Sequence, residues 1–167
     1  MNIPKKRNGY YYIGDKEYPA ITKILNDVLS KPALMYWAGK QCSRIALKDP
    51  TLNEKEVYSK FMEISRGAAD RGKQVHRIFE RWCQDKEFPP IPKEFEGYGN
   101  ALKSWVETHK PKPLRSEVEV HSDKWGYAGR CDLICHINDE IWLIDFKTGK
   151  NIYKEVGLQL VAYKEAI

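Results

Sequence analysis

Residues 130–147 read RCDLICHINDEIWLIDFK, and this stretch decides the fold. Two runs rich in β-branched and aromatic residues, 130–137 and 141–147, flank a short polar segment, which is the pattern of a β-hairpin. If Asn138 and Asp139 form a two-residue turn, Asp132 on the first strand faces Asp145 on the second. A longer turn would move this register by one or two residues.

The charged residues of the two strand runs, 130–137 and 141–147, gather at the end away from the turn, whereas both faces of the hairpin are otherwise largely apolar. We therefore expect it to lie in a sheet covered on both sides. Opposed carboxylates repel each other, and a divalent cation such as Mg²⁺ or Mn²⁺ relieves that conflict. Lys147, two residues after Asp145, is then placed to orient water or to stabilise charge on a phosphate. The alternative is a set of surface ion pairs, Asp145 with Lys147 and Asp132 with Arg130.

Before the hairpin the chain is mainly helical. Residues 9–25 predict a small hairpin or an extended segment with a turn at Gly14-Asp15, then a helix capped by Thr22. Residues 30–47 predict a helix with Ser30 as its N-cap and Pro32 in its first turn. Further helices are expected in 51–85, with a break near Gly67 to Gly72, and in 94–109.

A strand is expected at 115–122, and helical spacing returns after the hairpin, from 153 onward. The order of elements predicts an α/β fold of the mixed α+β kind, with the sheet built late in the chain. We expect residues 1–167 to form one domain, because this length suits a single core of ordinary size.

Composition narrows the class of protein. A hydrophobic fraction of 42% and a charged fraction of 31% are typical of a globular chain. No apolar run is long enough for a membrane span, and the basic N-terminus lacks the apolar region of a secretory signal. The four cysteines form no C-x-x-C pair, which favours buried thiols in a reducing, cytoplasmic compartment. The net charge of +5 is compatible with a phosphate-rich partner.

Three motifs, GRCDLI at 129–134, DFKTGK at 145–150 and QLVAY at 159–163, occur in that order. Together they resemble the PD-(D/E)XK nuclease superfamily. The similarity is greatest to its RecB-like exonuclease branch, which is related to the CRISPR-associated adaptation nucleases and the mitochondrial genome maintenance exonuclease. The resemblance implies that Asp132, Asp145 and Lys147 are catalytic and that both acids bind metal. RGKQVHRIFE, at 71–80, resembles the helical element that supplies a histidine ligand, which implies that His76 binds metal.

The resemblance also implies a restriction-endonuclease-like core in residues 66–167. That core has a central mixed sheet in which an antiparallel hairpin is flanked by helices. Residues 1–65 would then be a helical part that guides DNA. The chain ends four residues after Tyr163, so we expect a core that is compact or truncated at its C-terminal end. The implied cofactors are one or two Mg²⁺ or Mn²⁺ ions. No iron–sulfur cluster is expected, because no cysteine follows Cys135.

Further site residues are expected around this centre. Glu80 lies one helical turn after His76 and is a further candidate ligand, although it has Arg77 and Arg81 as alternative partners. Glu117 resembles a family position on the preceding strand and is expected to support the ligands or the local structure. The residues expected to contact nucleic acid are Gln159, Tyr163, Arg130, Thr148 and Lys150.

The resemblance therefore implies a metal-dependent DNA nuclease that hydrolyses phosphodiester bonds. We expect an exonuclease that acts on DNA ends or single-stranded DNA in recombination, repair or phage DNA processing, with no membrane partner. An endonuclease of the same superfamily and a non-catalytic DNA-binding module on this fold are the alternatives. An inactivated module would be expected to have lost Asp132, Asp145 or Lys147, and all three are present.

Overall fold

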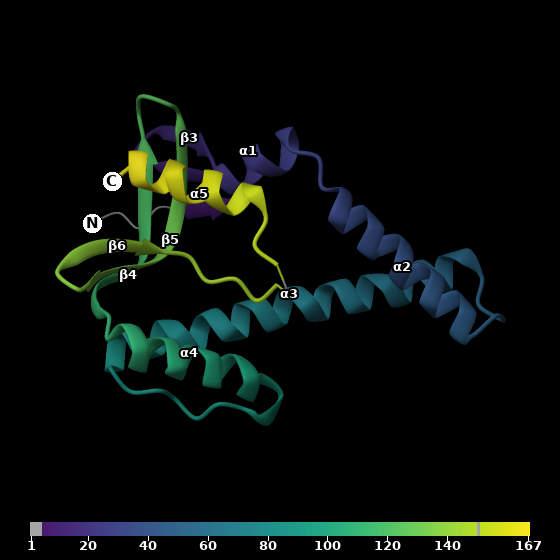
Figure 1. The fold of residues 1–167 in the computed structure, drawn as a ribbon. Coiled ribbons are helices and arrows are strands. Elements are labelled where there is room, and N and C mark those ends of the chain that lie inside the picture. The colour runs from purple at the N-terminus through teal and green to yellow at the C-terminus, as the bar shows by residue number, and fades with distance from the viewer. Residues whose placement is uncertain (1–4, 150) are drawn as a thin grey trace. The chain divides into compact units, whose positions relative to one another are not determined.

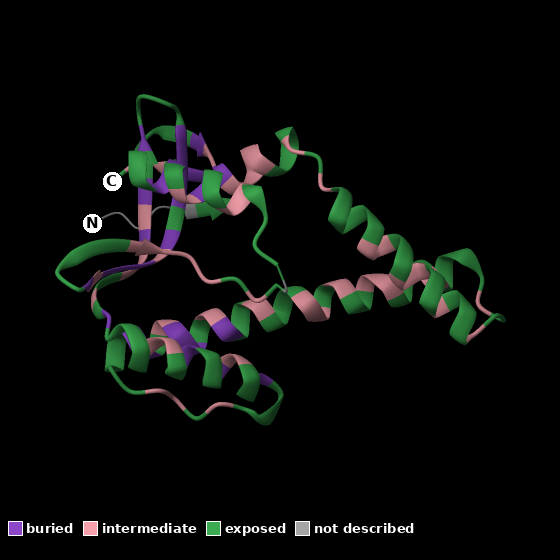
Figure 2. Cartoon of the chain, viewed as in Figure 1, coloured by how far each residue is buried: buried purple, intermediate pink, exposed green. Residues whose placement is uncertain are grey.

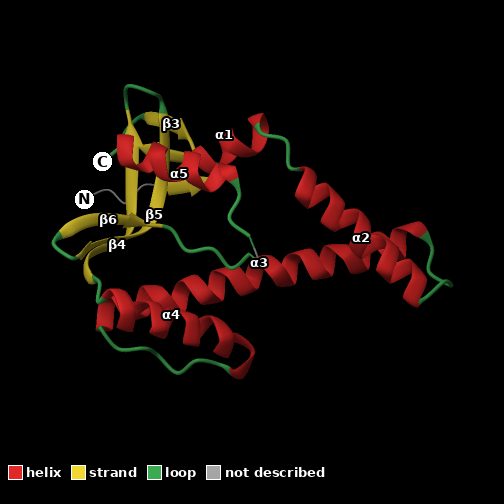
Figure 3. Ribbon diagram, in the orientation of Figure 1, coloured by secondary structure: helices red, strands yellow, loops and turns green. Residues whose placement is uncertain are grey.

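The computed structural model describes residues 5–149 and 151–167 (Figure 1). The chain divides into two compact units. One unit comprises Met1–Leu29 together with Val75–Ile167, and the other comprises Ser30–Gln74. The units therefore separate at Leu29 and Gln74, whereas the sequence motifs suggested a boundary near residue 65. Helices and strands occur together in the first unit, as the expected α+β class requires (Figure 3).

The first sheet is a meander of three short antiparallel strands. It contains β1 (Lys5–Arg7), β2 (Tyr10–Ile13) and β3 (Lys16–Pro19), and the predicted turn at Gly14-Asp15 is confirmed by the pairing of Ile13 with Lys16. Helix α1 (Ile21–Val28) follows directly.

The prediction that Thr22 caps helix α1 is wrong, because the cap is Ala20. The backbone of Ala20 is extended, its N–H donates to the carbonyl of Gly9, and it forms a parallel β-bridge with Ala128. Pairing with the sheets therefore holds Ala20 outside the helix, which begins at the next residue.

The second sheet is also antiparallel and contains β4 (Lys112–Ser122), β5 (Tyr127–Ile137) and β6 (Glu140–Ile144) in that order. The predicted hairpin register is confirmed, since Ile137 pairs with Glu140 and Ile134 with Leu143. Both turn residues between these strands have positive φ, which is the backbone of the two-residue turn that hairpins favour. Among the described residues the only parallel pairing is the Ala20–Ala128 bridge, so a central mixed sheet is not observed.

Strand β6 lies at the edge of this sheet, so the expectation that both faces of the hairpin are covered is wrong for this strand. Ile141 is 70% exposed and Trp142 is 46% exposed, whereas the central strand β5 is largely buried. The strand also ends at Ile144, earlier than predicted. Asp145 and Lys147 therefore lie in the loop that leaves the sheet.

The longest element is α3 (Glu54–Asp85), which runs without interruption through Gly67 and Gly72. The predicted break is wrong, because a glycine costs a helix interior only about 1 kcal/mol relative to alanine. Helix α2 (Pro32–Lys48) begins at the predicted proline, but its N-cap is Lys31 rather than Ser30.

The remaining helices agree with the sequence. A short turn of 3₁₀ helix (Lys93–Phe95) leads into α4 (Glu96–His109), and α5 (Lys154–Glu165) follows the hairpin. Within the described ranges, no helix combines the length and the apolar character needed to cross a bilayer.

The core of the first unit lies around the second sheet. One cluster joins the C-terminal part of α3 and α4 to Leu133 and Cys135, and another joins α1 and α5 to Cys131 and Ile134. In Figure 2 buried residues lie on the strands, on the second half of α3 and on α1, α4 and α5, whereas helix α2 carries none. Cys83 is also buried, and burial raises the pKa of its thiol to about 12, so this cysteine is an inert thiol as expected.

Candidate active site

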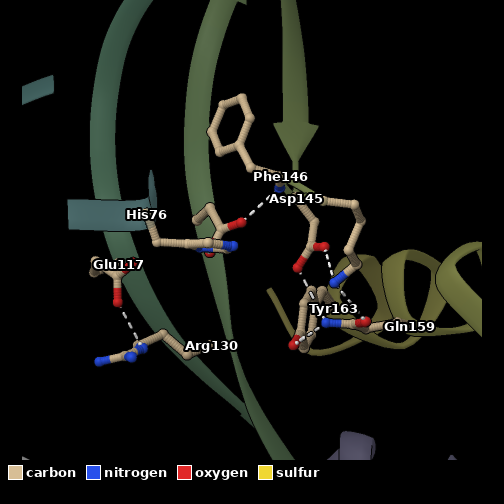
Figure 4. Close-up of polar contacts among 9 residues, drawn as sticks. His76, Glu117, Arg130, Asp145, Phe146, Gln159 and Tyr163 are labelled. Carbon is tan, nitrogen blue, oxygen red and sulfur yellow. Dashed lines mark hydrogen bonds and ion pairs between the residues drawn. The ribbon is translucent and has the colours of Figure 1, made fainter. Parts of the chain in front are cut away.

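Asp132, on the central strand β5, connects three parts of the candidate site, and Figure 4 shows its partners His76 and Phe146. Its Oδ1 lies 3.2 Å from Nδ1 of His76, which α3 supplies. Its Oδ2 accepts a hydrogen bond of 2.6 Å from the backbone N–H of Phe146, in the loop after β6. The side chain of Asp132 is only 12% exposed. This carboxylate therefore holds a helix, a strand and the loop with the D-x-K residues at one place.

Glu117 enters the site from strand β4, where it lies opposite Asp132 and has an unusual backbone conformation. Its neighbours Ser116 and Val118 pair with Leu133 and Cys131, which places Glu117 opposite Asp132. Its φ of 50° lies in the left-handed region, which residues other than glycine seldom adopt. Oε2 of Glu117 forms an ion pair with Nε of Arg130, at a distance of 2.8 Å.

His76, Glu117 and Asp132 together form a group that could hold a metal ion. One candidate ligand atom from each residue lies within 4.8 Å of the others, and all three residues are partly buried. The set offers one imidazole nitrogen and two carboxylate oxygens, a combination that suits Mg²⁺ or Mn²⁺ better than a soft, thiolate-seeking metal. Acidic residues near one another are also common without an ion, so these three residues are a candidate metal site.

Asp145 and Lys147 form a second, adjoining part of the site with two residues of α5 (Figure 4). Nε2 of Gln159 donates to Oδ1 of Asp145 at 3.0 Å and lies 2.7 Å from the hydroxyl of Tyr163. Nζ of Lys147 pairs with Oδ2 of Asp145 and lies 3.3 Å from Oε1 of Gln159. The side chain of Asp145 is 4% exposed. Within the described chain its Oδ2 receives no hydrogen bond of normal geometry, so the ammonium of Lys147 offsets the cost of burying this charge.

The electrostatics of the site reflect crowded, partly buried carboxylates. Burial raises the pKa of Asp145, and the charge of Asp132 raises it further, while Lys147 opposes both effects. Burial likewise raises the pKa of Glu117, against the influence of Arg130. The hydrogen bond between the His76 ring and the Asp132 carboxylate is the main cause that raises the pKa of His76. A cation bound among these groups would stabilise their charged carboxylates.

Several residues predicted from the sequence lie elsewhere or make other contacts. Gln159 and Tyr163 are buried behind Asp145, and the ring of Tyr163 packs on Gly129, so neither presents the surface that was expected to contact DNA. Glu80 accepts a hydrogen bond of 3.3 Å from Gln84 and is not in the group of three ligand residues.

Thr148, in the loop after β6, and Arg130 were both expected to contact nucleic acid, and they differ in exposure and in their partners. The carbonyl of Thr148 accepts a hydrogen bond of 3.4 Å from Tyr98, and this loop residue is partly buried. Arg130 is 53% exposed while it pairs with Glu117. Lys150 lies outside the described residues.

Two contributions were not anticipated from the sequence. Glu117 belongs to the group of ligand residues themselves, and the amide of Phe146 fixes Asp132. Glu117 would have been placed opposite Asp132 had the length of the β4–β5 turn been known, and that turn carries no two-residue signature. No sequence signal marks the Phe146 amide, because every residue except proline carries one.

In comparisons with known proteins, no family model matches the chain, and no curated protein matches it either.

Proposed function

We propose that the chain is a metal-dependent nuclease that hydrolyses phosphodiester bonds in DNA. The observation that carries the proposal is the meeting of His76, Glu117 and Asp132 beside the buried Asp145 side chain, which pairs with Lys147. The PD-(D/E)XK resemblance implies catalytic roles for Asp132, Asp145 and Lys147. The antiparallel hairpin with helices on either side is compatible with a restriction-endonuclease-like core, which belongs to the same proposal.

The donor set fits the implied metal. His76, Glu117 and Asp132 would hold one Mg²⁺ or Mn²⁺ ion, and the buried Oδ2 of Asp145 lacks a hydrogen bond of its own within the described residues. When bound, the ion would polarise a phosphate oxygen and lower the pKa of a bound water. Asp145 adjoins the group closely enough for its charge to interact with those of Asp132 and His76.

The protein's own residues hold the reacting groups in place. The amide of Phe146 and the ring of His76 orient Asp132, and Gln159 fixes one oxygen of Asp145. Lys147, held between Asp145 and Gln159, has its ammonium in position to orient water or to stabilise negative charge that develops on a phosphate. Gln159 and Tyr163 thus act by positioning Asp145 and Lys147 and do not contact the substrate.

The sequence motifs favour an exonuclease of the RecB-like branch, acting on DNA ends or single strands in recombination, repair or phage DNA processing. The test is to incubate the full chain with end-labelled DNA, linear and circular, single- and double-stranded, with Mn²⁺ or with EDTA. We expect Mn²⁺-dependent shortening of linear DNA. Cutting of circular DNA would instead identify an endonuclease, and cleavage that persists in EDTA would overturn the metal-dependent mechanism.

Asp145→Asn tests the role of the buried acid, because it keeps the size of the side chain and removes its charge. We expect cleavage to fall by roughly 100-fold or more, with little change in the melting temperature. Glu107→Gln, an exposed change on α4, is the matched control and should cleave like the wild type. DNA binding without any cleavage by the wild type in Mn²⁺ would favour the non-catalytic module.

A further inference from the structure

The N-terminal sheet adjoins the face of β5 that carries the candidate site. Alternate residues of a strand project to the same face, which groups Ala128, Arg130 and Asp132. Ala128 is fully buried in a cluster with Tyr11 and Ala20, and a β-bridge joins it to Ala20. The N-terminal sheet therefore packs next to Arg130, which lies between Ala128 and Asp132 in this row.

Lys6 supplies a second cation at this place. It pairs with Tyr11 across the β1–β2 ladder, and its Nζ lies 5.2 Å from the centre of the Tyr11 ring. Tyr11 is buried, so its ring has a fixed position against which the Lys6 ammonium packs. Lys6 lies near Arg130 because its partner Tyr11 packs in one cluster with Ala128, two residues before Arg130 on β5. In agreement with this placement, burial and then the charge of Arg130 lower the pKa of Lys6.

The carboxylates on the same face do not balance all of the positive charge that is present there once a divalent cation is bound. Glu117 pairs with Arg130, and Glu119 lies opposite Arg130 in the ladder. With a divalent cation bound and His76 neutral, the positive charges of Lys6, Arg130 and the ion exceed the three carboxylates of Glu117, Glu119 and Asp132 by one. A phosphodiester carries one negative charge and would balance that excess.

We propose that Lys6 and Arg130 form a phosphate-binding position on the Glu117 side of the candidate metal group. Arg130 offers a planar set of donors that suits phosphate oxygens, and Lys6 offers a mobile point charge. That the phosphate belongs to a nucleic-acid strand rests on the proposed nuclease function. Both residues act by positioning the strand, so their loss should raise KM more than it lowers kcat.

The test measures binding of a short fluorescent oligothymidylate to the full chain by anisotropy, over a series of salt concentrations and with Ca²⁺ present, because the excess positive charge requires a bound divalent cation. We expect Lys6→Gln to weaken binding about threefold to tenfold at low salt, and to reduce the slope of log K against log salt by about 0.7. Arg130→Gln should have a similar effect. Lys6→Arg, which keeps the charge, should bind like the wild type.

Lys124→Gln is the matched control, because it removes one charge from the exposed β4–β5 turn of the same unit. It should leave both the affinity and the salt slope unchanged. Titration with Mn²⁺ separates phosphate contact from a general disturbance of the site. Lys6→Gln should bind Mn²⁺ at least as tightly as the wild type, and weaker Mn²⁺ binding would count against the proposal.

The two proposals fail in different ways. If the wild type cleaves DNA, and Lys6→Gln and Arg130→Gln bind the oligonucleotide with wild-type affinity and salt slope, the phosphate position is overturned and the nuclease function stands. If the wild type neither binds nor cleaves, both are overturned.

Discussion

The two halves of α3 share one helix but have different surroundings. From Glu54 to Gln74, all of which the structure describes, no residue is buried. From Val75 to Asp85 the helix buries Val75, Ile78, Phe79, Trp82 and Cys83 against the sheet and α4. His76 lies in this second half and reaches Asp132.

This difference shows that helical periodicity places apolar residues on a face without deciding how deeply they are buried. Phe61 in the first half contacts Trp37 of α2 and stays partly exposed, because a pair of helices encloses little volume. Phe79 in the second half contacts Trp82, Trp105 and Phe146 and is 2% exposed. The packing that stabilises this half also fixes the rotation of the helix, and so the direction of the His76 ring.

Among these substitutions, removal of the Phe79 ring should have the largest effect on the free energy of unfolding. We expect Phe79→Ala to lower the free energy of unfolding by about 3–5 kcal/mol, because it opens a cavity in a closed core. Phe61→Ala is the matched change in the first half and should cost about 1 kcal/mol. Urea denaturation measures both. Equal losses of unfolding free energy would contradict the view that only the second half of α3 packs into the hydrophobic core.

The pH dependence of stability should distinguish His76 from the rest of α3. The pKa of His76 is raised in the folded protein, chiefly by its hydrogen bond with Asp132. Its contribution to stability is therefore complete below the ordinary value of 6.5 and is lost as pH rises through the higher folded-state pKa. In metal-free buffer the stability difference between wild type and His76→Gln should be about 1 kcal/mol at low pH.

Urea denaturation across the pH range measures this difference, which should vanish above the folded-state pKa. His109→Gln, on an exposed helix end, is the control and should show no such change. A difference that grows as pH rises would have the wrong sign for the hydrogen bond to Asp132.

A smaller effect of opposite sign is expected at Gly67, in the first half. A Cβ added there would meet no atom within 4 Å, and the residue lies inside a helix. Gly67→Ala should raise the free energy of unfolding by roughly 0.5–1 kcal/mol, because alanine has less freedom to lose on folding. Gly129→Ala is the contrasting change, since its Cβ would lie 2.3 Å from the buried ring of Tyr163. Thermal unfolding of both variants should show a gain for the first and a loss for the second.

The hairpin register could be predicted because a local signal specifies it. Asn138-Asp139 suits the left-handed backbone of a two-residue turn, and once the turn is known every pair from Ile137–Glu140 onward follows. The same reasoning failed for the end of β6. The amide of Phe146 bonds to the Asp132 side chain rather than extending the ladder, and that choice depends on a contact between strands.

Sequence by itself determined the β5–β6 register, the helical spacing of Gln159 and Tyr163, and the approach of Asp132 to Asp145, because turn chemistry and side-chain periodicity act over a few residues. Only the tertiary structure decided the entry of Glu117 into the site, the burial of Gln159 and Tyr163 behind Asp145, and the continuity of α3 through its glycines. The physical reason is that these features depend on groups far apart in the chain. Their free energies come from packing and from satisfying buried polar atoms, and neither can be evaluated until the fold has brought the partners together.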